Sequence, residues 1–311
     1  MATVTRARYS TGSALPAIPR PSASAIVVNE RNEILFVQRN PKARSFGGTY
    51  VFPGGNFDHK QDDSLALTAI RETFEETGLL LASSSAQASS VLDDAALDEA
   101  RKAIHAGSMR FSSFLSAHDS TPDVHSLLPF TSWVTPVQVP RRFHAQFFIT
   151  FLPHASSSGF SHGAKHDTIP TPDGGQEVLS AKFMHPAHAL LAYNSGRIAL
   201  MPPQFYLLTT LAQLLPGDLT TREQRERIYQ LSRGAFGSMV IHPRGLPEPD
   251  SEGRTILTYE GDETRGGSKG RLHRSLVRFG KGGVPTENVL QRNFDIFSEI
   301  ESQAFSPNAK L

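Results

Sequence analysis

The chain has 311 residues, with 31 lysines and arginines against 30 aspartates and glutamates, and it contains no cysteine. This length can bury a full core, as one enlarged domain or as two, and the near-zero net charge argues against a general nucleic-acid coat protein, so no nucleic-acid partner is expected. The missing cysteines exclude a disulfide framework and a thiolate zinc site, and no apolar run approaches the roughly 20 residues that span a bilayer.

The first 21 residues carry three arginines, no acidic residue and many Ser, Thr and Pro. They lack the apolar stretch of a secretory signal, so we interpret 1–21 as a flexible arm, with a mitochondrial presequence as the alternative. Behind this arm, Ser22–Val28 and Ile34–Gln38 are apolar runs separated by a short polar turn. This pattern predicts a hairpin that enters the core sheet.

A sharp turn, Pro53-Gly54-Gly55, leads into an acidic loop and then into a helix. Proline and paired glycines allow such a turn. Asp63 or Ser64 is expected to cap the start of the helix, and Gly78 is expected to take the left-handed position at its end.

This helix has two different faces. On a helical wheel, Arg71, Glu75, Glu72 and Glu76 lie at about 260°, 300°, 0° and 40°. The opposite face is apolar and consists of Ala66, Leu67, Ile70 and Phe74. Three carboxylates at this spacing repel each other unless a counter-ion is present, and hard divalent cations such as Mg²⁺ or Mn²⁺ suit carboxylate oxygens. The face therefore predicts a metal site, with a solvated acidic helix face as the alternative.

The segment 82–129 is expected to be an insertion. It starts with an Ala- and Ser-rich stretch, 82–90, which predicts a flexible link. Helical patterns follow at 91–104 and 109–118. The length of the insertion makes it a candidate lid or specificity element.

Two further core strands are predicted at Phe130–Pro136 and Phe143–Leu152. Arg141 and Arg142 lie between them and are candidates for binding substrate phosphates, because guanidinium groups bind phosphate oxygens in a bidentate manner. A structural arginine paired with a carboxylate is the alternative for each.

The last part of the chain is predicted to contain helices at 186–193, 201–215 and 221–233 and a hairpin of strands at 256–259 and 272–279. We interpret 217–311 as a C-terminal extension. Its segment from Arg265 to Lys281 has six basic residues and no acidic one. This segment fits either a site for a ligand phosphate or a solvated basic hairpin.

The nine residues from Arg71 to Leu79 resemble the second half of the Nudix box, G-x5-E-x7-R-E-U-x-E-E-x-G-U, where U is a bulky apolar residue. Asp63 stands where the first Glu of the box belongs, and Gly55 is two residues too early, so the loop is longer than the pattern. The resemblance implies an α/β fold, the Nudix α/β/α sandwich with a mixed sheet, over 22–216. It also implies a hydrolase that cleaves diphosphates linked to another moiety.

The resemblance assigns roles to the acidic face. Glu72 and Glu76 would hold Mg²⁺ or Mn²⁺, and Glu75 would be a shared ligand or would orient a water. Arg71 would pair with the carboxylates and fix their rotamers. Glu177, ahead of the predicted strand at 178–184, matches the position of a further Glu that serves as ligand or general base, and Glu76 is the alternative base.

Two other segments resemble one branch of this family. Arg44 to Gly55 resembles the R-x3-G-x3-F-P-G-G half of the signature of coenzyme A diphosphatases, although the upstream half of that signature is poorly kept. Trp133 to Phe148 resembles the W-x-T-P…R-R-F…F-F pattern of the peroxisomal (acyl-)coenzyme A diphosphatases, with His144 where that branch usually has Asp. The expected substrate-binding residues are Arg44, Gly54, Gly55, Arg141 and Arg142.

The branch implies hydrolysis of coenzyme A or acyl-coenzyme A to adenosine 3′,5′-bisphosphate and (acyl-)phosphopantetheine. Two alternatives stay open. One is a diphosphatase for ADP-ribose, NADH or another nucleoside diphosphate derivative, and the other is a non-catalytic module that binds a nucleotide. The complete set of Arg71, Glu72, Glu75 and Glu76 favours an enzyme.

The final tripeptide, Ala309-Lys310-Leu311, resembles the Ser-Lys-Leu peroxisomal address. It predicts binding to the peroxisomal import receptor and a location in the peroxisome, with the mitochondrion or cytoplasm as alternatives.

Overall fold

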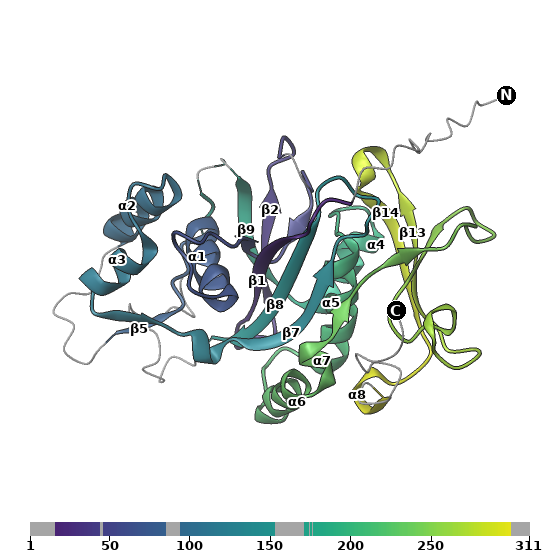
Figure 1. Ribbon diagram of the computed structural model, residues 1–311. Coiled ribbons are helices and arrows are strands. Elements are labelled where there is room, and N and C mark those ends of the chain that lie inside the picture. Colours follow the sequence, from purple (N-terminus) through teal and green to yellow (C-terminus); the bar gives the residue numbers. More distant parts are fainter. Residues whose placement is uncertain are drawn as a thin grey trace.

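A computed structural model describes residues 16–43, 46–84, 94–152, 171–173, 175 and 177–299 (Figure 1). Its centre is a mixed sheet with the strand order β10-β7-β8-β1-β2-β3, to which β4 is added beside β1 and β9 beside β2. The strands are β1 (Arg20–Val28), β2 (Ile34–Arg39), β3 (Tyr50–Val51), β4 (Gly54–Asn56), β7 (Leu128–Val134), β8 (Phe143–Phe151), β9 (Val178–Met184) and β10 (Val240–Ile241). β1 runs parallel to β8 and antiparallel to β2 and β4.

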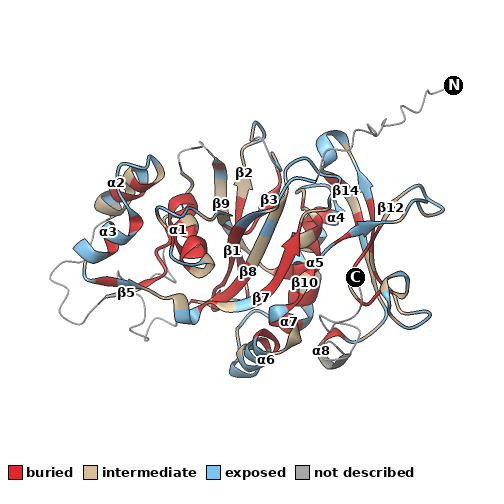
Figure 2. Cartoon of the chain, in the orientation of Figure 1, coloured by how far each residue is buried: buried red, intermediate tan, exposed pale blue. Residues whose placement is uncertain are grey.

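Both faces of this sheet are buried, which explains the continuous apolar runs of its strands (Figure 2). On one face, Ala25 and Val27 pack in the same cluster as Phe74 of α1 (Leu65–Thr77). On the other face, Ile26 and Val28 belong to a cluster with the helices α4, α5, α6 and α7. These helices span Pro186–Asn194, Pro202–Leu214, Arg222–Arg233 and Ala235–Ser238. The arrangement confirms the predicted α/β class with helices on both sides of a mixed sheet.

The ends of α1 follow the sequence signals. The hydroxyl of Ser64 accepts a hydrogen bond from the backbone N–H of Leu67 at 3.2 Å, so Ser64 rather than Asp63 is the N-cap. Gly78 adopts a left-handed conformation with φ of 71°, and its N–H donates to the carbonyl of Phe74. These caps fix the length of α1 and hence the direction of its acidic face.

The segment after α1 forms a small layer of its own, beside α1 and away from the sheet (Figure 1). It contains β5 (Ala82–Ser84), α2 (Asp94–His105), α3 (Phe111–Ala117), β6 (Ser120–Pro122) and a 3-10 turn at Val124–Ser126. Sequence reasoning placed a flexible link from residue 82, whereas β5 pairs with β6 in an antiparallel ladder. Residues 85–90 of the predicted link and the first three residues of the helix predicted at 91–104 lie outside the described part. Phe114 stacks on Phe74 of α1 at a ring distance of 5.5 Å, so α3 is packed on α1.

The C-terminal part adds a second, antiparallel sheet of β11 (Arg244–Gly245), β12 (Thr255–Thr258), β13 (His273–Phe279) and β14 (Pro285–Arg292). Short turns at Glu263–Arg265 and Lys281–Gly283 and the helix α8 (Ile296–Glu299) complete it. The predicted hairpin is the β12–β13 pair. Within the basic segment, Arg265, Arg274 and Arg278 form ion pairs with Glu260, Asp262 and Glu287. These pairs favour the structural interpretation of that segment over a phosphate site.

An aromatic cluster joins this second sheet to the central one. The ring of Trp133 in β7 lies 5.4 Å from those of Tyr206 in α5 and Tyr259, the residue directly after β12. The hydroxyl of Tyr206 bonds to Nε2 of His273 at 2.8 Å. No helix of the described residues is long and apolar enough to cross a membrane.

Candidate active site

The acidic face of α1 lies under the turn that contains β4. Because β4 pairs with β1, this turn is held against the start of the sheet. The backbone N–H of Gly54 donates to Oε2 of Glu76 at 3.0 Å. A Cβ atom at Gly55 would overlap the carboxylate of Glu72. The paired glycines therefore let the backbone approach two of the three predicted metal ligands closely.

Arg71 is the centre of an ion-pair network. Its side chain is buried, and its Nε and Nη2 donate to the two oxygens of Asp62 at 2.8 Å each. Its Nη1 donates to Glu72 at 2.9 Å and to Glu75 at 2.8 Å. Its Nη2 also reaches the carbonyl of Asn56 at 3.3 Å. One guanidinium thus fixes two carboxylates of the acidic face and ties them to the preceding loop.

Asp62 was missed by sequence reasoning, which placed Asp63 at the first acidic position of the box. In the structure Asp63 is exposed, whereas Asp62 is buried and binds Arg71 in a bidentate manner. Asp62 also accepts hydrogen bonds from the hydroxyl of Thr68 and the N–H of Asp58. The longer loop shifts the register by one residue, and two adjacent aspartates give no signal that separates them.

Glu76 is buried in an unusual environment. Its Oε2 accepts from Gly54, but its Oε1 has no hydrogen-bond partner. The nearest cation is Nη1 of Arg39, 3.9 Å from Oε1, which is too far for a hydrogen bond. Burial and then the charge of Glu72 raise the pKa of Glu76 well above its usual value. Oε1 therefore accepts no hydrogen bond from the described residues, and Arg39 compensates its charge only from 3.9 Å.

The charge of Glu177 acts on Glu72 as well as on Glu76. Burial raises the pKa of Glu72 to about 7, against the opposing effect of Arg71. The charge of Glu177 raises the pKa values of both Glu72 and Glu76, so the structure brings Glu177 near the pair. Glu177 is exposed, just before β9, and its backbone carbonyl accepts from the N–H of Asn40 at 2.8 Å.

Glu75 differs from its two neighbours because both of its oxygens have partners. Oε1 accepts from Arg71, and Oε2 lies 3.3 Å from Nδ1 of His105. His105 ends α2, so a residue of the segment between α1 and β7 contacts the acidic face. No pattern in the sequence identifies His105, because the contact depends on how α2 packs beside α1.

The described residues contain no group of three Asp, Glu or His side chains already arranged to hold a metal ion. They do contain two adjacent carboxylates, the half-buried Glu72 and the buried Glu76, with raised pKa values and one oxygen without a hydrogen-bond partner. Such a pair fits a hard divalent cation, which would remove the repulsion and the desolvation cost. Glu75 fits this role less well, because Arg71 and His105 occupy its oxygens.

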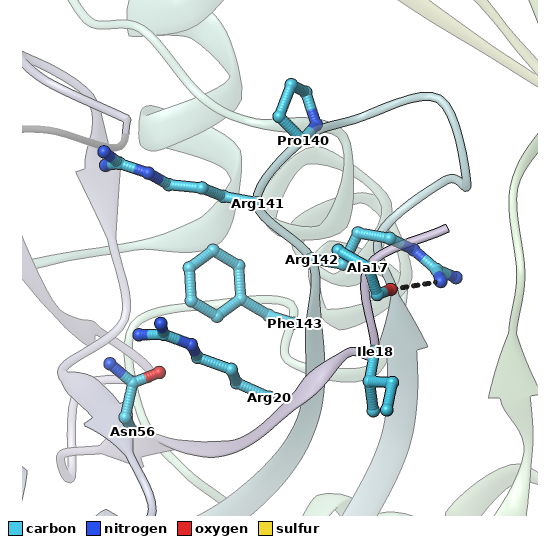
Figure 3. Close-up of a pocket in the computed structure, with 8 residues that line it drawn as sticks. All are labelled: Ala17, Ile18, Arg20, Asn56, Pro140, Arg141, Arg142 and Phe143. Atoms are coloured by element: carbon cyan, nitrogen blue, oxygen red, sulfur yellow. Dashed lines mark hydrogen bonds between the residues drawn. The ribbon is translucent and has the colours of Figure 1, made fainter. Parts of the chain in front are cut away.

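The predicted substrate arginines lie around a cavity of about 460 Å³ at the start of β1 and β8 (Figure 3). Arg141 and Arg142 line it together with Arg20 and Asn56. Nε of Arg142 donates to the carbonyl of Thr135, and its Nη1 donates to that of Ala17. Arg44 lies outside the described residues.

Comparison with known proteins agrees with this geometry. A family model described as the NUDT19 Nudix domain matches residues 60–211. The acyl-coenzyme A diphosphatase NUDT19 of Xenopus laevis is 26% identical over 243 residues, which cover 59% of this chain and 60% of that protein. The namesake from Gallus gallus is 26% identical over 221 residues, covering 63% and 51%.

The fold is also similar to that of a NUDIX hydrolase from Alicyclobacillus acidocaldarius, with a TM-score of 0.50, 26% identity and coverage of 63% of this chain and 92% of that one. The chain is thus similar to the Nudix hydrolases in sequence and in fold. Within the family it resembles the NUDT19 branch. It spans between 51% and 60% of the length of these two curated relatives.

Proposed function

We propose that this protein is a divalent-metal-dependent diphosphatase that hydrolyses coenzyme A or acyl-coenzyme A. The products would be adenosine 3′,5′-bisphosphate and (acyl-)phosphopantetheine. The observation that carries the proposal is the pair of Glu72 and Glu76, both with raised pKa values, beside a cavity lined by three arginines. The names of the NUDT19 relatives support the choice of substrate.

Hydrolysis adds one water molecule across the diphosphate. The water oxygen bonds to one phosphorus, the bridging P–O bond breaks, and a proton passes to a base. Mg²⁺ or Mn²⁺ held by Glu72 and Glu76 would polarise the phosphoryl oxygens and lower the pKa of water. Glu177 is exposed next to this pair and can accept the proton, while Glu76 with its unpartnered oxygen is the second candidate.

The other residues position these groups. Arg71 holds Glu72 and Glu75 in fixed rotamers through its hydrogen bonds. The N–H of Gly54 donates to Glu76, and the backbone of Gly55 lies against the carboxylate of Glu72. Arg141 and Arg142, with Arg44, are proposed to contact substrate phosphates, and Arg142 would do so with a side chain that is already held by two carbonyls.

A comparison of substrates tests this proposal. We expect kcat/KM for coenzyme A with Mg²⁺ or Mn²⁺ to exceed that for ADP-ribose and NADH at least about tenfold, a difference of about 1.4 kcal/mol in transition-state binding. Removal of the metal by a chelator should abolish turnover. The reverse preference would support a diphosphatase for ADP-ribose or NADH, and binding without turnover of any of the three would support a non-catalytic module.

We also propose a peroxisomal location through recognition of Ala309, Lys310 and Leu311 by the import receptor. These residues lie outside the described part, so the proposal rests on their sequence. Imaging of a fluorescent fusion with and without the last three residues distinguishes the peroxisome from the mitochondrion and the cytoplasm.

A further inference from the structure

The cavity near the acidic face has a chemistry that the diphosphate alone does not explain. It measures about 460 Å³, a size typical of small-molecule sites. Its lining contains three arginines and no acidic residue. The eight lining residues are Ala17, Ile18, Arg20, Asn56, Pro140, Arg141, Arg142 and Phe143. Such a lining attracts an anion.

The three arginines are not equivalent. Arg142 donates to the carbonyls of Thr135 and Ala17, and Figure 3 shows its guanidinium beside Ala17, on the far side of the backbone from Arg20. Arg20 is exposed, and among the described residues no carboxylate lies within ion-pair distance of its guanidinium. Figure 3 shows the ring of Phe143 between the side chains of Arg20 and Arg141. Arg20 therefore offers an uncompensated cation at a cavity that contains an aromatic face.

The sheet explains how Arg20 reaches this place. Arg20 begins β1, where its Cα pairs with that of Phe143 in the parallel β8. Its backbone N–H donates to the carbonyl of Arg142 at 2.9 Å. These contacts place the side chains of Arg20 and Phe143 next to each other, although 123 positions separate them in the sequence. Because this contact depends on residues so far apart in the sequence, sequence reasoning could not detect it and assigned Arg20 to a flexible arm.

The cavity is connected to the candidate active site through Asn56. Asn56 lines the cavity, and its backbone carbonyl accepts a hydrogen bond from Arg71, which also binds Glu72. The cavity thus adjoins the carboxylates but does not include them. A substrate whose diphosphate lies at Glu72 and Glu76 would place a neighbouring part of itself, rather than the diphosphate, in the cavity.

We propose that this cavity binds the phosphorylated adenosine end of the substrate, with Arg20 on the ribose 3′-phosphate and the ring of Phe143 beneath the base. The proposal rests on the proposed function and deepens it. A guanidinium with no internal partner is suited to a phosphate dianion, and an aromatic face stacks any nucleobase. ADP-ribose and NADH lack this additional phosphate, so Arg20 would be a specificity-determining residue.

Direct binding is the first test. Affinities of metal-free protein for adenosine 3′,5′-bisphosphate and for adenosine 5′-monophosphate are measured by calorimetry. We expect the bisphosphate to bind about tenfold more tightly to the natural chain, and Arg20→Gln to remove this difference. Arg31→Gln is the matched control, because Arg31 is exposed in the turn between β1 and β2 and its guanidinium pairs with Glu33. Equal affinities for the two nucleotides in the natural chain would overturn the proposal.

Kinetics provide the second test and separate the two proposals. Arg20→Gln should raise KM about tenfold for coenzyme A while leaving kcat, and both constants for 3′-dephospho-coenzyme A, within about twofold. Arg20→Lys should retain part of the discrimination. If Arg20→Gln affects both substrates equally, or neither, the role of Arg20 is wrong and the diphosphatase stands. If the protein prefers the bisphosphate in binding but does not hydrolyse coenzyme A, the proposed function fails and the cavity assignment stands.

Discussion

Replacement of Glu76 by Gln should lower kcat about a thousandfold, which corresponds to about 4 kcal/mol in the activation barrier, while the fold stays intact. The amide can still accept the hydrogen bond from Gly54, so the shape of the site is kept. What is lost is the charge of a carboxylate whose Oε1 accepts no hydrogen bond from the described residues and which is proposed to hold the metal. Steady-state assays with coenzyme A and Mg²⁺ measure the loss.

Although Glu76→Gln lowers kcat, it should raise the stability of the metal-free protein at high pH. Because the pKa of Glu76 is raised in the folded state, the folded protein binds its proton more tightly than the unfolded chain. The metal-free natural protein therefore loses stability as pH rises above the usual pKa of a Glu, and the Gln variant should lose less. Urea unfolding at pH 5 and pH 8 with a chelator tests this. Glu99→Gln, at an exposed position of α2, is the control. Near-normal turnover of the Glu76 variant would refute the metal assignment.

Asp62→Asn should destabilise the protein by about 3 kcal/mol, because it leaves the buried guanidinium of Arg71 without its bidentate partner. The adjacent Asp63→Asn should change the free energy of unfolding by less than about 0.5 kcal/mol, since Asp63 is exposed. The two substitutions are chemically identical and one residue apart, so each serves as the control for the other. Denaturant unfolding at neutral pH measures both.

Asp62→Asn should also lower activity, because Arg71 would no longer hold Glu72 and Glu75 in place. Equal effects of the two substitutions on stability would mean that the loop register in the structure is wrong. A larger effect of Asp63→Asn would restore the register expected from the Nudix box.

The parts that sequence predicted well are those set by local rules. The apolar and acidic faces of α1, its Ser64 cap and its Gly78 end follow from helical periodicity and capping chemistry. The strand at Val178–Met184 has the predicted bounds. The family resemblance supplied the mixed sheet and the helices on both sides of it, which local patterns alone do not determine.

The parts that sequence did not predict depend on tertiary contacts. His105 meets Glu75 only because α3 and α2 pack beside α1, and Arg20 meets Phe143 only because β1 and β8 are parallel neighbours. Sequence reasoning chose Asp63 instead of Asp62 because the loop is longer than the family pattern. Within that loop, two adjacent aspartates are equivalent by sequence. Long-range register cannot be obtained from residue spacing within one segment.

The short strand β10 bears on whether copies of this protein can associate through the edge of the central sheet. Val240 and Ile241 lie along β7, where the N–H of Ser132 donates to the carbonyl of Met239. Without these two residues, this part of β7 would be an open edge with unpaired backbone N–H and C=O groups. Such edges can pair with another chain and promote aggregation. β10 lies in the part of the chain that follows residues 60–211, the range matched by the family model. The C-terminal extension thus covers part of the edge that β7 would otherwise leave open.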